Sequence, residues 1–406
     1  MACKTWASHH RRWRYTAGST AVLALIYLDN NSTTRPRQVV VEALAEAELR
    51  YWGNSSSPHR LGQEAKRALQ AAKRSIGAHL GCRANELVLT SGATESNNLA
   101  IAGVFEAEQF RRQPRKHILV SAIEHPSVLE AAEALETHGA LVDQIKVDIS
   151  GHLDVADLRL KLSPDTLLVS VMAANNEVGT LQPIAEVAEA CHQVGAYCHT
   201  DATQWLGRLP VDLAEWGIDL LSASAHKLHG PKGVGLLFAR AGLPLSEQQH
   251  GGGHQGSKRS GTVDVPGVVA FAKALQAAAD QPYWDSVKDL RERLFEGLAK
   301  SAGPLERISP AEGCLPNTLN VRFKGVDSEA LMASAPTICC SPGSACSHAT
   351  PKPSHVLMAM GLDSESAGEC LRFSLSQATT AAEIDEAIKL LAEAAGYVRS
   401  ALEEAA

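Results

Sequence analysis

The chain has 406 residues, of which 45 % are apolar and 20 % charged, and its net charge is −7. This composition is that of an ordinary globular protein, so extensive disorder is excluded and about two or three domains are expected. The acidic balance argues against a nucleic-acid partner, because such proteins carry an excess of Lys and Arg. The longest apolar runs, such as residues 21–28, are far shorter than the roughly 20 residues that cross a membrane. We therefore expect neither nucleic acid nor a membrane as a partner.

The N-terminal segment is basic. Residues 1–28 contain Lys4, Arg11, Arg12 and Arg14 but no Asp or Glu. An Arg-rich leader without acids is found in organellar transit peptides, but an over-long start without a targeting role is the favoured interpretation. We therefore treat residues 1–26 as a leader or extension, and we expect a cytoplasmic protein unless this leader directs it to an organelle.

The interior of the chain alternates between short apolar runs and amphipathic stretches. The apolar runs are the expected strands, at residues 86–90, 117–121, 166–173, 196–200, 218–223 and 234–239. Helical patterns follow the first two runs, one extending to about residue 112 and the other over residues 126–138. Because the runs are apolar on both faces, they suit a parallel sheet covered by helices. The alternation predicts a layered α/β domain.

A Gly-rich basic stretch at residues 248–261 interrupts this alternation. Beyond it, helices are expected at residues 265–279, 284–301 and 380–399, and strands at residues 317–323 and 370–375. We predict a large domain over residues 36–280. Residues 27–35 and 281–406 would form a smaller α+β domain.

The nine cysteines show no framework of regular spacing, so a disulfide scaffold is not expected. Cys339 and Cys340 are adjacent and the chain has no Cys-x-x-Cys, so the usual zinc patterns are absent. We expect a reducing compartment and no metal.

Polar residues follow several of the predicted strands. In an open α/β sheet, function gathers in the loops at the carboxyl ends of strands. Residues 91–98 (SGATESNN) form a Gly turn that opens a helix, which suits an anion, although an ordinary N-cap by Ser91 or Thr94 explains the pattern equally well. Neither a dinucleotide-binding Gly motif nor a P-loop is present. His125 and the paired amides Asn175 and Asn176 follow the next strands as candidate ligands, or as structural residues of turns.

Two further loops carry a carboxylate and an amine. Asp201 stands just past a buried strand, where a carboxylate is costly unless it has a cationic partner. Lys227 directly follows another apolar run, and a desolvated lysine has a lowered pKa and can form a Schiff base. An exposed lysine in a Gly/Pro-rich turn is the alternative. Pyridoxal phosphate (PLP) needs a lysine for its imine, an acid on its ring nitrogen and a phosphate cradle, which Thr94, Ser224 and His226 offer.

A cysteine stands in a long loop near the C-terminus. Cys346 lies in residues 341–357 (SPGSACSHATPKPSHVL) among Gly, Ser and Pro, with Lys352 and two histidines close in sequence. An accessible thiol in such surroundings can act as a thiolate nucleophile, whereas from composition alone a free surface thiol is favoured.

Taken together, these segments resemble the cysteine desulfurases, a branch of the class V aminotransferase-like PLP enzymes. The resemblance spreads over motifs in family order from residue 27 onward. The matching segments are residues 27–36 (YLDNNSTTRP), 90–101 (TSGATESNNLAI), 124–128 (EHPSV), 175–184 (NNEVGTLQPI), 199–213 (HTDATQWLGRLPVDL), 224–235 (SAHKLHGPKGVG), 250–262 (HGGGHQGSKRSGT), 315–321 (LPNTLNV), 341–357 and 371–375 (LRFSL).

The resemblance implies a PLP-dependent, aspartate-aminotransferase-like fold (fold type I), with a large mainly parallel sheet domain and a smaller α+β domain. It also implies roles for cofactor-binding residues. Lys227 would hold PLP covalently and move protons, and His125 would stack on the ring and assist proton transfer. The ring nitrogen, the phenolic oxygen and the phosphate would be bound by Asp201, by Gln204, and by Ala93, Thr94, Ser224, His226 and the partner subunit's Thr262.

The resemblance further implies how substrate is bound and converted. Asn176, counted also among the cofactor-site residues, and Arg372 would hold the carboxylate of L-cysteine, for which a planar guanidinium is suited. Cys346 would take the sulfur as a persulfide and alanine would be released. The long loop resembles the group that serves iron–sulfur cluster assembly, so a sulfur acceptor or iron–sulfur scaffold protein is the expected partner. A homodimer is expected, since two-fold dimers are common and these active sites lie at the subunit interface.

The chain departs from the family pattern at three places. Pro58 is displaced within residues 54–59 (NSSSPH), Pro342 precedes the Gly of the catalytic loop, and Ser376-Gln377 stand where many members carry Gly-Arg. The last change removes a positive charge near the expected substrate, which leaves specificity open. Selenocysteine lyase or another class V enzyme is therefore an alternative. A non-catalytic protein that keeps the fold is disfavoured because Lys227, Asp201 and Cys346 are all present. A Cys/His metal protein is disfavoured because Cys346 with His348 is too sparse for a structural zinc site.

Overall fold

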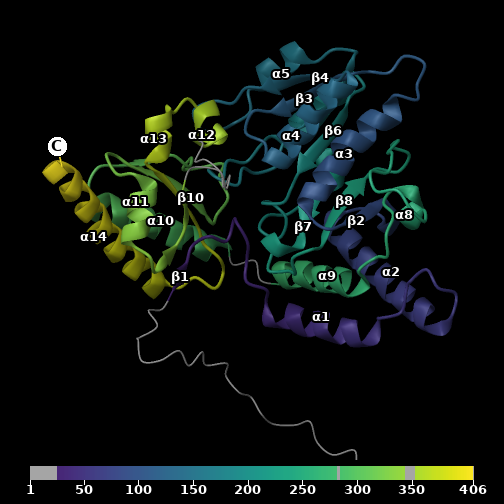
Figure 1. Cartoon of the computed structure of the whole chain (residues 1–406), viewed down its shortest axis with the longest axis horizontal. Helices are drawn as coiled ribbons and strands as arrows, with labels where there is room; N and C mark the ends of the chain where they lie inside the picture. The colour runs from purple at the N-terminus through teal and green to yellow at the C-terminus, as the bar shows by residue number, and fades with distance from the viewer. Residues whose placement is uncertain (1–24, 281–283, 343–352, 406) are drawn as a thin grey trace, which may run out of the picture.

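The protein folds into two lobes (Figure 1). The computed structural model describes residues 25–280, 284–342 and 353–405. The larger lobe is built on a seven-stranded sheet with the order β2-β8-β7-β6-β5-β3-β4. Its strands are β2 (Leu87–Thr90), β3 (His117–Ser121), β4 (Leu141–Ile145), β5 (Thr166–Ser170), β6 (Tyr197–Asp201), β7 (Leu220–Ser224) and β8 (Gly235–Ala239).

The strand directions place one set of strand ends along a single edge of this sheet. Neighbouring strands from β4 to β7 are parallel, whereas β8 is antiparallel to both β7 and β2. Because two reversals cancel, β2 runs in the same direction as β7. The carboxyl ends of β2, β3, β5, β6 and β7 therefore meet at the same edge. The predicted large, mainly parallel sheet is confirmed, with β8 as its antiparallel member.

Helices cover both faces of the sheet, as Figure 1 shows. One hydrophobic cluster joins strand residues such as Leu119 and Leu221 to a first layer of helices, to which Phe271 belongs. A second cluster joins the alternate strand residues, such as Ile118 and Leu220, to the helices on the other face. The first layer comprises α1 (Gln38–Arg50), α2 (Arg60–Leu80), α5 (Val155–Lys161), α6 (Ile184–Gln193), α7 (Leu213–Trp216) and α9 (Val265–Ala279), and the second comprises α3 (Ala93–Glu108) and α4 (Pro126–Ala134). The period-2 alternation of strand side chains explains why both layers have apolar partners.

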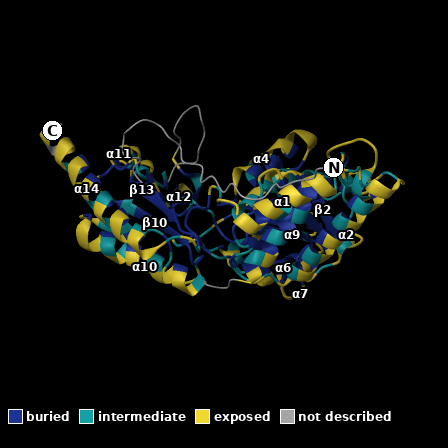
Figure 2. Ribbon diagram, turned by 90° about the horizontal axis from the view of Figure 1, so that it is seen from below, coloured by how far each residue is buried: buried dark blue, intermediate teal, exposed yellow. Residues whose placement is uncertain are grey.

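The smaller lobe contains a four-stranded antiparallel sheet. Its order is β12-β13-β10-β9. Its strands are β9 (Leu305–Arg307), β10 (Thr318–Phe323), β12 (Ser341–Pro342) and β13 (Cys370–Ser374), and its packed helices are α10 (Trp284–Ser301), α11 (Ser328–Ser334) and α14 (Ala381–Ala405). Figure 2 shows both sheets as buried layers and the outer helix faces as exposed.

Several short elements complete the fold. β1 (Ile26–Tyr27) pairs with β11 (Ile338–Cys339), so the first described residues lie against the smaller lobe. The turns α8 (His254–Ser257), α12 (His355–Ala359) and α13 (Ser364–Gly368) lie in the segments that follow β8 and precede β13. The bounds of the two domains stay a prediction.

The sequence placed α9 and α10 correctly but misjudged other element ends. The helix expected to reach residue 112 ends at Glu108, and the helix expected over residues 126–138 is α4 followed by a 3-10 turn, η2 (Leu135–His138). Edge strand β4 was not predicted, because only Ile145 of its five residues is buried and the run lacks a strand pattern. No helix in the described ranges is long and apolar enough to cross a bilayer.

Gly235 lets the backbone of β8 pack closely against neighbouring segments at the sheet edge where the carboxyl ends of the strands meet. A Cβ on this residue of β8 would lie 2.5 Å from the Cα of Gly92 and 2.8 Å from the carbonyl oxygen of Ala223. We expect Gly235→Ala to lower the free energy of unfolding by about 1–3 kcal/mol, because backbone atoms must shift to admit the methyl group. Urea unfolding followed by circular dichroism measures this change.

The matched control is Gly396→Ala on α14, where an added Cβ meets nothing within 4 Å. Because alanine favours a helix interior over glycine, this variant should be stabilised by up to about 1 kcal/mol. An unfolding midpoint of Gly235→Ala equal to that of the wild type would contradict the packing argument.

Candidate active site

A cavity of about 720 Å³ opens where the strand ends of the larger sheet face the smaller lobe. Nearly all the residues that the sequence singled out line it. They are Ala93, Thr94, His125, Asn176, Asp201, Gln204, Ser224, His226, Lys227 and Arg372. Thr262 is exposed and is not part of this lining, and Cys346 lies outside the described residues.

One end of the cavity is suited to an anion. Helix α3 begins at Ala93 after Gly92, and no side chain caps it. The alternative of an ordinary cap by Ser91 or Thr94 is therefore wrong, because Thr94 lies within the first turn and Ser91 precedes the N-cap position. The uncapped N–H groups and the helix dipole favour a negative group at this end.

Hydroxyl and imidazole groups surround this helix end. Within the described residues, the hydroxyls of Thr94 and Ser224 have no hydrogen-bond partner, although both residues line the cavity. His226 bonds through Nδ1 to the hydroxyl of Thr33 at 3.1 Å, so its Nε2 remains available. Burial, together with the charges of Lys227 and Lys232, lowers the pKa of His226 to about 4. His226 is therefore a neutral ligand at pH 7.

A hydrogen-bond chain links Asp201 to His125. The side-chain nitrogen of Asn97 donates to Asp201 Oδ2 at 2.8 Å and to Ser127 Oγ at 2.9 Å. The backbone N–H of Thr203 donates to Asp201 Oδ1 at 2.9 Å. Asn97 is fully buried, so this chain holds the Asp201 carboxylate in one orientation at the cavity wall.

The same chain sets the protonation of His125. The backbone N–H of Ser127 donates to His125 Nδ1 at 3.1 Å, and the Ser127 hydroxyl lies 2.8 Å from the same atom. Because Asn97 donates to this hydroxyl oxygen, the hydroxyl proton is free to bond Nδ1. Burial is the largest cause of the lowered pKa of His125; the Asp201 charge acts in the opposite direction, and the charges of Lys227 and His355 add smaller contributions that lower it. His125 is therefore neutral, with its proton on Nε2.

Lys227 is the buried amine of the site. Its Nζ donates to the carbonyls of Asn31 at 2.5 Å and Ser32 at 2.7 Å. Burial lowers the pKa of Lys227 to about 7, and the charges of Arg372 and Arg208 add to that effect. Near neutral pH a large share of this amine is therefore unprotonated and able to attack a carbonyl carbon.

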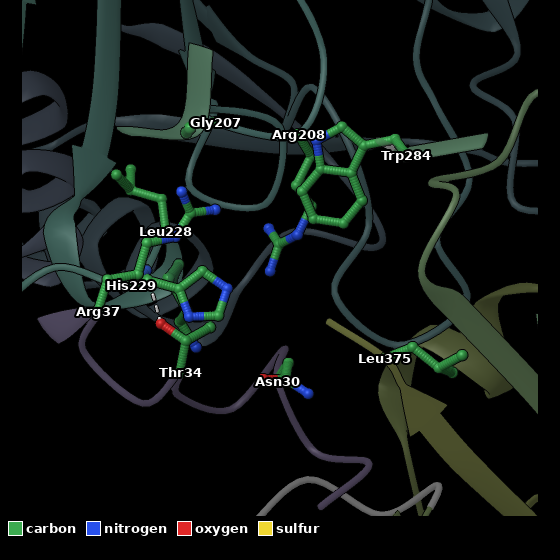
Figure 3. A pocket seen from close by; sticks show the side chains of 11 residues that line it. Asn30, Thr34, Arg37, Gly207, Arg208, Leu228, His229, Trp284 and Leu375 are labelled. Carbon is green, nitrogen blue, oxygen red and sulfur yellow. Dashed lines mark hydrogen bonds between the residues drawn. The ribbon is translucent and has the colours of Figure 1, made fainter. Parts of the chain in front are cut away.

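A second, small pocket, which Lys227 also lines, is shown in Figure 3. It measures about 10 Å³, which is room for one water molecule. Arg208, His229 and Trp284 contribute to its wall. The buried guanidinium of Arg208 donates to the carbonyl of Gln204 at 2.5 Å, so a fixed positive charge lies in the wall of the pocket that Lys227 also lines.

Arg372 and Asn176 lie at the side of the cavity formed by the smaller lobe. Arg372 Nη2 contacts Asp29 Oδ1 at 2.7 Å and Ser341 Oγ at 2.8 Å, and Nη1 donates to the Asn176 carbonyl at 3.1 Å. Its Nε is buried without a partner, and the side-chain amide of Asn176 has none in the described part of the chain. Unused donors of this kind suit a carboxylate ligand.

The reasoning from strand ends missed several residues of the site. Asn97 and Ser127 carry the hydrogen-bond chain, Asn31 supplies the carbonyl that holds Lys227, and Glu95 and Ser341 join the cavity wall. All of them lie within or beside the segments that carry the resemblance. Their signal was present in the motifs, but only the three-dimensional contacts give them roles.

Comparisons with known proteins agree with this site. The aminotransferase class-V family matches residues 26–387. A cysteine desulfurase of Frankia sp. (strain EuIK1) is 43 % identical over 93 % of this chain and 92 % of its own. A cysteine desulfurase IscS of Anaeromyxobacter sp. (strain K) is 40 % identical over 91 % of this chain and 92 % of its own.

Solved structures give the same result. A NifS-like protein superposes with a TM-score of 0.85 at 36 % identity, covering 92 % of this chain and all of the other. A structure described as SspA in complex with cysteine has a TM-score of 0.76 at 31 % identity, covering 86 % and 98 % of the two chains. The chain belongs to the class-V aminotransferase family and, within it, to the cysteine desulfurases.

A buried histidine on the strand that ends at Asp201 gives a testable pH dependence. His199 bonds to Ser170 Oγ at 2.8 Å and Ser222 Oγ at 3.0 Å, and burial lowers its pKa to about 4. As pH falls from about 6.5 to 4, the unfolded chain takes up a proton here that the folded chain does not. We expect this residue to lower the free energy of unfolding by up to about 3 kcal/mol over that range.

Urea unfolding between pH 4 and 7 measures this effect. His199→Gln should be less stable than the wild type at pH 7 but should lose less stability on acidification. His250→Gln, which replaces an exposed histidine, is the control and should keep the wild-type slope. A slope in His199→Gln equal to that of the wild type would show that His199 is not responsible.

Proposed function

We propose that this chain is a PLP-dependent cysteine desulfurase that converts L-cysteine to L-alanine and retains the sulfur as a persulfide on Cys346. The observation that carries the proposal is the placement of Lys227, Asp201 and the uncapped end of α3 around one cavity. These are the three groups that PLP requires: an amine for its aldehyde, an acid for its ring nitrogen and a cradle for its phosphate.

The residues present fit this cofactor. The phosphate would lie at the α3 N-terminus against Thr94, Ser224 and His226, and Asp201 would bind the ring nitrogen. Buried polar atoms of the cavity residues Thr203 and Gln204 have no partner among the described residues, which is expected where a polar ligand completes the site. Gln204 would contact the phenolic oxygen and His125 would stack on the ring.

When bound, PLP supplies an electron sink for the substrate carbon atoms. The protein would supply binding, orientation and proton transfer. Arg372 and Asn176 would hold the substrate carboxylate, which fixes its α-carbon near Lys227. Lys227 would accept and return protons through Nζ, for which its pKa of about 7 is suited. His125 would donate a proton from Nε2.

The two ends of the segment that carries Cys346 are fixed at the cavity. On one side Ser341 contacts Arg372, and on the other Ser354 Oγ donates to the buried Glu177 at 2.5 Å. His355 Nε2 bonds the carbonyl of Glu124 at 2.8 Å. This anchorage supports the proposal that the Cys346 thiolate collects the substrate sulfur. The sulfur would then pass to an acceptor, for which we propose an iron–sulfur scaffold protein, since several relatives carry the name IscS.

Replacing the amine and the thiol separately tests the proposal. Lys227→Ala should lose the visible absorbance of bound PLP and should form alanine at least about 100-fold more slowly, because the covalent link and the proton carrier are removed. Cys346→Ala should keep the absorbance but form no persulfide from L-cysteine. Spectrophotometry, alanine quantification and mass spectrometry of the trypsin-cleaved protein give the three readouts.

Lys300→Ala and Cys82→Ala are the matched controls, since both residues are absent from the lining of the cavity. Both should retain wild-type absorbance and alanine release. A Lys227→Ala variant with unchanged absorbance would reject the assignment of the amine. Faster alanine release from L-selenocysteine than from L-cysteine in the wild type would favour a selenocysteine lyase instead.

We also propose that the enzyme is a homodimer in which Thr262 of one subunit serves the phosphate site of the other. Thr262 is exposed and does not line its own cavity, which supports a role in trans. Exposed apolar side chains on and after α1, namely Val39, Val41, Leu49 and Trp52, are candidates for burial between subunits.

Mixing two inactive variants tests this arrangement. Thr262→Ala should bind PLP more weakly than the wild type, and Lys227→Ala should be inactive. In mixed dimers, the site that keeps Lys227 receives an intact Thr262 from the other chain, so activity at limiting PLP should rise above that of either variant alone. No gain after subunit exchange, or an active monomer in sedimentation, would contradict the proposal.

A further inference from the structure

A charged pair lies beside the anion end of the cavity. Glu95 belongs to the first turn of α3 and lines the cavity, and its Oε2 accepts a hydrogen bond from the backbone N–H of Ser91 at 2.7 Å. Arg259 grips the same carboxylate with two nitrogens, Nε at 2.7 Å from Oε1 and Nη2 at 3.2 Å from Oε2. The two side chains are 25 % and 18 % exposed, so both are largely removed from water.

The loop that carries Arg259 is held in place by other contacts. The side-chain amide of Gln255 bonds both backbone groups of Leu89, at 2.7 Å from its N–H and 2.8 Å from its carbonyl, and so pairs with the open edge of the large sheet. Gln255 and Ser257 have positive φ angles of 53° and 57°, a strained conformation that persists only where neighbouring contacts enforce it. The backbone that carries Arg259 is therefore held by contacts that do not involve Glu95.

The negative carboxylate of Glu95 opposes the binding of a phosphate at the N-terminus of α3. Burial raises its pKa, but hydrogen bonds from Arg259 and Ser91 outweigh burial and lower it, so Glu95 is negative at neutral pH. An acid in the first turn stabilises a helix whose N-terminus is empty. A phosphate at the same N-terminus is repelled by that acid unless a cation neutralises it.

We propose that Arg259 is a positioning residue for the cofactor phosphate, because it neutralises Glu95 and so leaves the N-terminus of α3 open to a dianion. This inference rests on the proposed PLP site and deepens it. Lys232 is the other lysine side chain beside Lys227 in the cavity wall, but it is exposed and has no carboxylate partner in the described ranges. Among the described residues, Arg259 is therefore the cation that pairs with the Glu95 carboxylate.

The test compares PLP with pyridoxal, which carries the same aldehyde but no phosphate. Each protein is purified from the cells in its folded form and dialysed against graded concentrations of PLP or of pyridoxal. The visible absorbance of the protein then measures how much aldehyde is bound. Arg259→Gln should weaken PLP binding by at least about tenfold, because it leaves Glu95 uncompensated next to the phosphate. Pyridoxal binding should weaken by less than about threefold, because this ligand carries no negative phosphate.

A second substitution separates charge from structure. Glu95→Gln keeps an acceptor for Ser91 but removes the charge, so alone it should leave PLP binding equal or tighter. In the double variant with Arg259→Gln, PLP affinity should return to within about threefold of the wild type. Arg293→Gln, which breaks an exposed ion pair with Asp385 on the smaller lobe, is the control for ion-pair loss and should bind both aldehydes normally.

The outcomes are distinguishable. If Arg259→Gln weakens PLP and pyridoxal equally, or if the double variant binds PLP as poorly as Arg259→Gln, the proposal is overturned and Arg259 only supports its loop. If the wild type gains no visible absorbance with PLP, the proposed function fails instead. Thermal unfolding of every variant confirms that each affinity belongs to a folded protein.

Discussion

The site depends on the desolvation of one amine. Burial, and to a smaller extent the positive charges of Arg372 and Arg208, lower the pKa of Lys227 against the opposing charges of Asp201 and Asp29. The amine is held by two backbone carbonyls rather than by a carboxylate. A carboxylate in contact would favour the charged ammonium, whereas carbonyl oxygens accept hydrogen bonds from the neutral amine as well. The nucleophile is therefore prepared by its surroundings before any ligand arrives, and these surroundings come from both lobes.

The carbonyls that hold Lys227 belong to the N-terminal segment, which the smaller lobe positions. Asn31 accepts a bond from Lys227 through its carbonyl, and its side chain contacts Thr318 on β10 at 2.9 Å. Its backbone N–H donates to Ser374 on β13 at 2.9 Å. Movement of the smaller lobe would therefore alter the environment of the amine. The division into lobes thus contributes directly to the chemistry of the site, beyond providing a wall for the substrate.

Many residues of the site could be predicted from the sequence. The features that could not be predicted depend on contacts or strand directions that the sequence pattern does not record. Asp201 and Lys227 were identifiable because each directly follows an apolar run, and a polar group there must have a purpose or a partner. The reversed direction of β8 was not identifiable, because an apolar run of five residues is the same in either direction. Asn97 was overlooked as one of several polar residues in a helix, since its role depends on contacts with Asp201 and Ser127 far along the chain. Cys346, which the resemblance made the sulfur acceptor, lies outside the described residues.

An arginine is paired with an acid at each of the two ends of the cavity that would bind an anionic group. At the α3 end, a phosphate would meet helix N–H groups, neutral His226 and a carboxylate that Arg259 has already paired. At the other end, a substrate carboxylate would meet Arg372, which itself is paired with Asp29. In each case an arginine lies against an acid, so the cavity contains oriented donors without a large excess of bare positive charge. Such a site can bind two anionic groups at fixed places. Each additional bare cation would lower the pKa of Lys227 further, but it would also attract anions to the wrong end of the cavity.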